Sequence, residues 1–214
     1  MATLLGLYNG ALRNIGERRL TSVSEARESR RELDDAYTGL VNYVLSRGYW
    51  KFALRTTKVS HTPSVAPAFG YTKAYEKPVD LVRISKICQD EFLNIPLLQV
   101  SEEATYWFGP LDDVYVQYVS NDIAYGGDLS KWPETFTLYV ESYLTTQVAP
   151  RLKPDMDLDR TIAHTKRLLA EAQSVDAMAG PTEFAPPGAW GAARGGRPTN
   201  GGRRDRGSRG QLIG

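Results

Sequence analysis

Two runs in the middle of the chain decide its fold, Tyr75-Glu76-Lys77-Pro78-Val79-Asp80-Leu81-Val82-Arg83 and Val114-Tyr115-Val116-Gln117-Tyr118-Val119. Both are rich in the β-branched and aromatic residues that favour strands. Strand-like runs are expected at about 71–76, 81–89, 98–108 and 113–120, because turn signals such as Asn94-Ile95-Pro96 and Gly109-Pro110 separate them. The middle of the chain therefore predicts a small antiparallel sheet.

The segment that leads into this sheet also has a period of two. Between Trp50 and Arg55, large apolar side chains alternate with small or charged ones, which predicts a half-buried strand. Two prolines then make residues 60–70 a loop. We expect Trp50 and Phe52 to pack where the sheet meets the helices.

Helical periodicity precedes the strands. Residues 3–14 predict an amphipathic helix that ends at the next glycine. Ser22-Val23-Ser24-Glu25 is typical of a capping box, so a second helix is expected from about 24 to 46, with Gly48 as its stop. Its apolar face is formed by Ala26, Leu33, Ala36, Tyr37, Leu40, Val41, Val44 and Leu45. The charged residues of its first two turns lie off this face and form either a solvated surface or a contact with another subunit.

Helical periodicity returns after the strands. Tyr125-Gly126-Gly127-Asp128 is expected to be a flexible link, and Pro133 suits the first turn of a third helix. The core face of that helix comprises Phe136, Tyr139, Val140, Tyr143, Leu144 and Val148. Pro150 and Pro154 interrupt the pattern before a fourth helix at about 155–178. The apolar positions of the fourth helix are Leu158, Ile162, Leu169, Ala172 and Val175.

The predicted fold class is α+β, a bundle of about four helices with a small inserted antiparallel β-domain and an extended C-terminal tail. Residues 1–48 and 126–180 are expected to form the bundle, 49–125 the β-domain and 181–214 the flexible tail. In the core, side chains of the third helix should meet those of the second, which sets Phe136, Tyr139, Tyr143 and Leu144 against Leu33, Tyr37, Leu40 and Val44.

The tail has a composition of its own. Residues 181–214 contain nine Gly, four Pro and six Arg against two acids, a net charge of +4, so the first 180 residues carry −3 of the total of +1. Such a segment cannot bury enough apolar surface to offset its chain entropy, so we expect it to be disordered until a partner orders it. A slightly acidic body also lacks the basic face of a dedicated DNA clamp.

No catalytic, cofactor or metal site is expected. The two histidines, His61 and His164, have no Cys or His at ligand spacing, and Cys88, the single cysteine, suits a buried thiol. Adjacent acids on a strand point to opposite faces, so neither Glu102-Glu103 nor Asp112-Asp113 forms a dyad. The sequence lacks a signal-peptide pattern and a long apolar run, which predicts synthesis in a cytosol and no membrane span.

An ordered set of aromatic-marked segments runs through the chain. It comprises Gly48-Tyr49-Trp50-Lys51-Phe52, Phe69-Gly70-Tyr71, Tyr75, Pro78-Val79-Asp80-Leu81-Val82-Arg83, Val116-Gln117-Tyr118-Val119 and Trp132-Pro133-Glu134-Thr135-Phe136. Together with the two leading helices, this set resembles the tail tubular protein A family, the head-to-tail adaptors of short-tailed bacteriophages. The resemblance covers about residues 3–178, and the Gly- and Arg-rich end departs from the family pattern.

The resemblance implies a structural virion protein, made in the host cytoplasm and placed at the head–tail junction. Family members form a homo-oligomeric ring, typically a dodecamer, under the portal protein. The ring extends the DNA channel, lets genomic DNA pass without sequence-specific binding, and presents a platform for a downstream tail or nozzle protein. No enzymatic activity, cofactor or membrane is implied.

Two sets of site residues follow from this resemblance. The C-terminal tail would bind the portal through apolar anchors and arginines, namely Phe184, Trp190, Arg194, Arg197, Arg203, Arg204, Leu212 and Ile213. Because a conduit should not grip DNA and the body carries a net charge of −3, acidic residues of the β-domain would face the channel or the nearby ring surface, namely Glu102, Glu103, Asp112 and Asp113.

Three alternatives remain open at the level of sequence. The chain could be another neck or tail completion protein, or a nucleic-acid-binding protein that acts through its Arg-Gly tail. An enzyme that degrades the cell wall is the third, although no positioned acid pair supports it.

Overall fold

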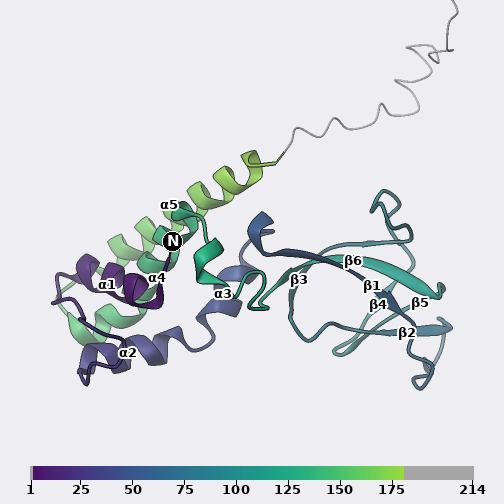
Figure 1. Cartoon of the computed structure of the whole chain (residues 1–214), viewed down its shortest axis with the longest axis horizontal. Helices are drawn as coiled ribbons and strands as arrows, with labels where there is room; N and C mark the ends of the chain where they lie inside the picture. The colour runs from purple at the N-terminus through teal and green to yellow at the C-terminus, as the bar shows by residue number, and fades with distance from the viewer. Residues whose placement is uncertain (1, 181–214) are drawn as a thin grey trace, which may run out of the picture. The chain divides into compact units, whose positions relative to one another are not determined.

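Five α-helices and six β-strands occupy residues 2–180, the part of the chain that the computed structural model describes (Figure 1). Helices α1 (Leu4–Ile15), α2 (Glu28–Tyr37) and α3 (Leu40–Ser46) precede the strands, and α4 (Glu134–Leu152) and α5 (Leu158–Met178) follow them. The predicted α+β class is confirmed. The boundaries predicted at 48/49 and 125/126 fall inside one compact unit, Met1–Gly180.

The first helix begins and ends as its sequence predicts. The hydroxyl of Thr3 accepts a hydrogen bond from the backbone N–H of Gly6 at 3.1 Å, which caps the N-terminus. Gly16 adopts a left-handed conformation with φ 76°, and its N–H donates to the carbonyl of Arg13 at 3.1 Å. Glycine takes this conformation without a steric penalty, so the helix stops there.

The prediction of one continuous helix over residues 24–46 is wrong. Thr38 is extended and Gly39 is left-handed, with φ 77°, so the chain breaks into α2 and α3. The predicted capping box is also wrong. The carboxylate of Glu25 accepts from the N–H and the hydroxyl of Thr21, at 2.8 and 3.0 Å, and α2 starts only after Arg27.

The strands form two antiparallel three-stranded sheets rather than the single sheet that was predicted. The first has the order β1-β6-β3, and the second has the order β2-β5-β4. Their bounds are Leu54–Ser60 for β1, Lys73–Glu76 for β2, Leu81–Cys88 for β3, Ser101–Glu102 for β4, Tyr106–Gly109 for β5 and Asp113–Ser120 for β6. The strand predicted at 98–108 is therefore two short strands that both belong to the second sheet.

The aromatic segment before β1 is not a strand. Residues Lys51–Ala53 form the 3-10 helix η1, and the strand begins only at Leu54. Trp50 is buried, and its indole N–H donates to the carbonyl of Val44 at 3.1 Å. A side chain at Gly48 would lie 2.8 Å from the Trp50 ring, so this glycine makes room for the indole.

The link at 125–128 is a packed turn, not the flexible connection that was predicted. The N–H of Gly126 donates to the Ser120 carbonyl at 3.2 Å, and the carbonyl of Gly126 accepts from the Trp132 indole N–H at 2.9 Å. A Cβ at Gly126 would lie 2.4 Å from the Ser120 carbonyl oxygen. The glycine is therefore needed for close packing. Pro133 is the residue directly before α4, and Pro150 lies within the last turn of that helix.

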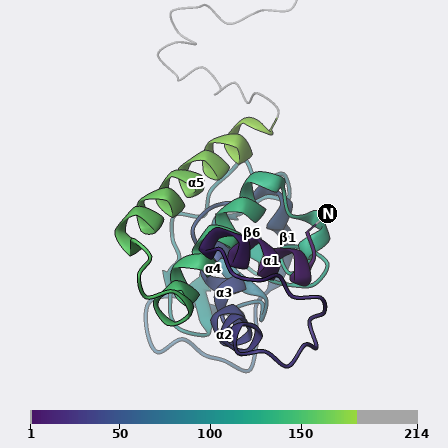
Figure 2. The same ribbon diagram turned by 90° about the vertical axis from the view of Figure 1, so that its left-hand side faces the viewer.

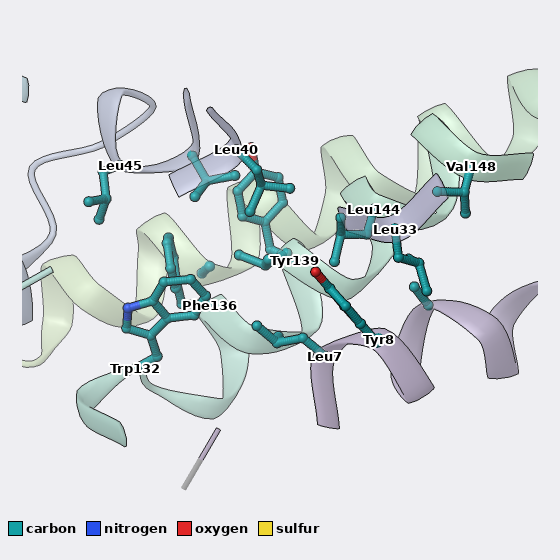
Figure 3. Close-up of a cluster of buried hydrophobic side chains, with 14 of the residues drawn as sticks. Leu7, Tyr8, Leu33, Leu40, Leu45, Trp132, Phe136, Tyr139, Leu144 and Val148 are labelled. Atoms are coloured by element: carbon teal, nitrogen blue, oxygen red, sulfur yellow. The ribbon is translucent and has the colours of Figure 1, made fainter. Parts of the chain in front are cut away.

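The main core lies among the helices and reaches the start of β1 (Figure 3). Phe136 is at its centre, with ring centroids at 4.7 Å from Trp50, 4.9 Å from Phe52 and 4.9 Å from Trp132. The predicted packing of the third helix on the second is confirmed, since one cluster contains Leu33, Tyr37, Leu40, Val44, Phe136, Tyr139, Tyr143 and Leu144. A smaller core between the two sheets contains Tyr75, Leu97, Trp107, Val114, Val116 and Tyr118.

Helix α5 lies beside α4 (Figure 2), and the predicted apolar positions account for only part of its buried face. Its buried positions are Thr161, Thr165 and Ala172. The hydroxyls of Thr165 and Ser142 hydrogen-bond at 2.7 Å between the two helices. Of the predicted apolar positions Ala172 is buried, whereas Ile162 and Val175 remain 36% and 39% exposed.

Candidate interaction surfaces

The segment Pro78–Arg83 anchors β3 to its surroundings through Asp80. The Asp80 carboxylate, 18% exposed, accepts hydrogen bonds from Arg55 at 2.9 Å and from the Tyr118 hydroxyl at 3.0 Å. The hydroxyl of Ser120 also donates to it. One acid at the start of β3 thus holds together side chains of β1 and β6, the strands that pair in the first sheet.

The electrostatics of this network follow from its geometry. Burial alone would raise the pKa of Asp80, but the hydrogen bonds from Ser120, Arg55 and Tyr118 together lower it below its ordinary value. Burial, followed by the hydrogen bond to Asp80, raises the pKa of the Tyr118 hydroxyl. The network is therefore held by an ionised carboxylate at neutral pH.

Arg83, at the other end of the same segment, connects the strands to the helices. Its guanidinium donates to the carbonyl of Ser46 at 2.8 Å, in the last turn of α3, and lies 4.2 Å from the centroid of the Tyr49 ring. A cation at a helix C-terminus satisfies a free carbonyl and suits the helix dipole. Pro78–Arg83 thus joins the first sheet to the helical core.

The C-terminal end of α5 is anchored beside this junction. The backbone N–H of Lys51 donates to both oxygens of Asp176, at 3.0 and 3.2 Å, and its ammonium donates to the Ala177 carbonyl at 2.9 Å. Burial raises the pKa of Asp176, although the hydrogen bond from Lys51 acts in the opposite direction. The described chain ends at Gly180, where an added Cβ would lie 2.3 Å from the Lys51 nitrogen.

The acidic residues predicted to face a channel do not converge on one site. They are Glu102, Glu103, Asp112 and Asp113, all exposed or half-exposed in the strand region. Lysines pair with three of them, in the pairs Lys77–Glu102 at 2.7 Å, Lys58–Asp113 at 2.8 Å and Lys73–Asp112. Each hydrogen bond from a lysine lowers the pKa of its aspartate. Asp112 and Asp113 are therefore ionised at neutral pH, and a lysine partly neutralises each of them.

No part of the described chain gathers groups for metal chemistry. Across residues 2–180 no three His, Cys, Asp or Glu side chains are placed to hold a metal ion. Cys88 is buried as predicted, and burial raises the pKa of its thiol. In the same residues, no helix combines the length and the apolar character that crossing a membrane requires.

The residues predicted to bind a portal lie outside the described residues. They are Phe184, Trp190, Arg194, Arg197, Arg203, Arg204, Leu212 and Ile213. The predicted disorder of the 181–214 tail falls on the same residues.

Sequence reasoning missed two features of the described chain. The first is the network around Asp80, for which the signal was a single acid between a proline and an apolar strand. The second is the outward face of α5, for which the only signal was threonine at positions 161 and 165, one helical turn apart.

No protein-family model matches the chain, and no curated protein matches it. The resemblance to the tail tubular protein A family therefore rests on the order of the elements and on their aromatic markers.

Proposed function

We propose that the chain is a structural virion protein, the head-to-tail adaptor of a short-tailed phage. Copies would form a ring, typically of twelve, under the portal protein at the head–tail junction. The ring would continue the DNA channel and carry the downstream tail or nozzle protein. The residues of the described chain would act by contact and position, with no cofactor and no catalytic group.

The observation that carries this proposal is the junction formed by Pro78–Arg83. An adaptor must hold two partners at a fixed distance, so its helical and strand regions must move as one body. Asp80 fixes the start of β3 within its sheet, and Arg83 bonds that strand to the end of α3. The same residues belong to the ordered set on which the family resemblance is based.

The anchored end of α5 supports the same function. Lys51 fixes Asp176 and Ala177 near the junction, so the basic C-terminal segment starts from a defined point of a rigid body. A basic segment with a few apolar side chains has a composition that suits capture of a partner. Twelve such segments in one ring would bind with a high effective concentration once the first is docked.

Electron microscopy of the purified chain mixed with its portal protein tests the proposal. We expect a ring coaxial with the portal, and we expect a chain truncated after Gly180 to fold but to dock poorly. A chain that occupies another position in the virion would instead be a different neck or tail completion protein. Steep salt-dependent DNA binding that the truncation abolishes would favour the nucleic-acid-binding alternative.

A further inference from the structure

An apolar groove remains open where α3, α4 and α5 meet. It has a volume of about 410 Å³, and its lining includes Tyr43, Tyr143, Leu158, Ile162 and Leu169. The rings of Tyr43 and Tyr143 stack with centroids 4.8 Å apart, and Tyr43 is 42% exposed. Thr165, which hydrogen-bonds Ser142 of α4, also lines the groove, and Ile162 beside it is 36% exposed. Exposed apolar surface of this kind is typical of a contact site.

The charges at this groove select the chemistry of its occupant. Arg47 and Lys166 line it, both exposed, and no carboxylate is among the lining residues. Neither cation forms an ion pair with any residue of the 2–180 range. An aromatic or aliphatic side chain next to a carboxylate therefore fits best. The basic segment 181–214, with its net charge of +4, is electrostatically a poor occupant.

A loop with the matching chemistry lies between β3 and β4. In residues 89–98, hereafter the apolar loop, Phe92, Ile95 and Leu98 are 75%, 55% and 85% exposed. Glu91 precedes Phe92, is also exposed, and has no cation partner in the described chain. Because Phe92 is exposed, it does not fill the groove of its own chain.

The apolar loop is held in one conformation. The carboxylate of Asp90 accepts from the N–H groups of Asn94 and Ile95, at 3.1 and 2.7 Å. Leu93 has a left-handed backbone, with φ 58°, which a side-chain-bearing residue adopts only under local constraint. A preorganised loop loses little entropy when it binds, so its outward side chains are suited to contact.

We propose that the apolar loop of one copy docks in the α3–α4–α5 groove of the next copy. Phe92 would enter between the tyrosines and Ile162, and Glu91 would pair with Arg47 or Lys166. The contact joins two different surfaces of the same chain, so it propagates from copy to copy and yields a ring when the rotation closes. This inference deepens the proposed function, because it names the subunit contact of the ring on which that function rests.

A complementation experiment tests the contact. Phe92→Asp removes the loop anchor and leaves the groove intact, whereas Ile162→Asp does the reverse. We expect the wild type to form species larger than a dimer by light scattering, and each variant alone to be monomeric. An equimolar mixture should give a heterodimer and nothing larger, because only one intact loop and one intact groove remain. Phe69→Asp, at an aromatic residue that is 89% exposed in another loop, is the matched control and should assemble like the wild type.

Cross-linking provides the second readout. Cys88 is the only cysteine and is buried, so introduced cysteines react without background. Glu91→Cys mixed with Lys166→Cys, which keeps Phe92 and Ile162 in place, should give a covalent dimer with a short bismaleimide, whereas Phe69→Cys with Lys166→Cys should not. A monomeric wild type, or variants that assemble unchanged, would overturn the contact. If Phe92→Asp and Ile162→Asp each still form rings on a portal, the proposed contact is wrong but the proposed function stands. If the two variants form the expected heterodimer but the wild type does not bind a portal, the contact stands and the proposed function is wrong.

Discussion

Replacing Phe136 with alanine should destabilise the described fold more than a typical core substitution. Phe136 is 1% exposed, so the substitution creates a cavity where the helical core meets the start of β1. Removal of a buried phenylalanine costs about 3–5 kcal/mol, a range that already includes the loss of its ring contacts. Phe136 has three ring neighbours within 5 Å, at 4.7, 4.9 and 4.9 Å. We therefore expect a loss of about 4 kcal/mol.

The assay is thermal and chemical unfolding of the full chain, with Phe69→Ala as the control. Phe69 is 89% exposed, so its replacement should change stability by less than about 0.5 kcal/mol. In a domain of this size a loss of about 4 kcal/mol lowers Tm by roughly 8–16 °C. Measurement at two protein concentrations separates folding from self-association. A Phe136→Ala chain that melts within about 2 °C of the Phe69→Ala chain would refute this view of the core.

Three further substitutions test individual features of the fold. Gly126→Ala should lower the free energy of unfolding by about 1–3 kcal/mol, because the new Cβ meets the Ser120 carbonyl at 2.4 Å; equal stability in urea titrations would contradict a packed turn. Gly39→Ala should lower the free energy of unfolding by only about 1 kcal/mol, because φ is 77° but no atom lies within 4 Å of the new Cβ. A larger loss than for Gly126→Ala would contradict this ranking of the two glycines. Asp80→Asn should flatten the acid limb of the stability curve: the lowered pKa of Asp80 stabilises the fold above about pH 4, the unfolded value, and this contribution disappears as pH falls through the lower folded value. Parallel curves for the two chains below pH 5 would show that Asp80 is not responsible.

The sequence allowed accurate prediction where one periodicity persists and one face is buried. Strand β6 was predicted at 113–120 and spans those residues, because its alternating side chains face the core between the two sheets. The C-terminal end of α1 was equally predictable, since Gly16 acts through neighbouring backbone groups. Local chemistry was sufficient in both cases.

Prediction failed where the outcome depends on a distant partner. The helical period of Leu33, Tyr37, Leu40 and Val44 continues across the break at Gly39, so apolar spacing alone could not reveal two helices. The alternation from Trp50 to Leu54 predicted a strand, but the same spacing is compatible with the 3-10 helix η1 and with burial of the Trp50 indole. Whether one sheet or two forms depends on long-range pairing that no local pattern contains.

The prediction of which side chains of α5 are buried was only partly correct, and this error has consequences for function. The predicted apolar positions of α5 were Leu158, Ile162, Leu169, Ala172 and Val175, and burial of all five on α4 would have been the ordinary outcome. The structure buries Ala172 of these positions together with Thr161 and Thr165, and the Thr165 hydroxyl hydrogen-bonds Ser142 of α4. The apolar surface that α5 leaves exposed is therefore available for contact with a partner. The exposed Ile162 and the exposed Phe92 are therefore better explained together, as two halves of one contact between copies, than as two separate defects of the fold.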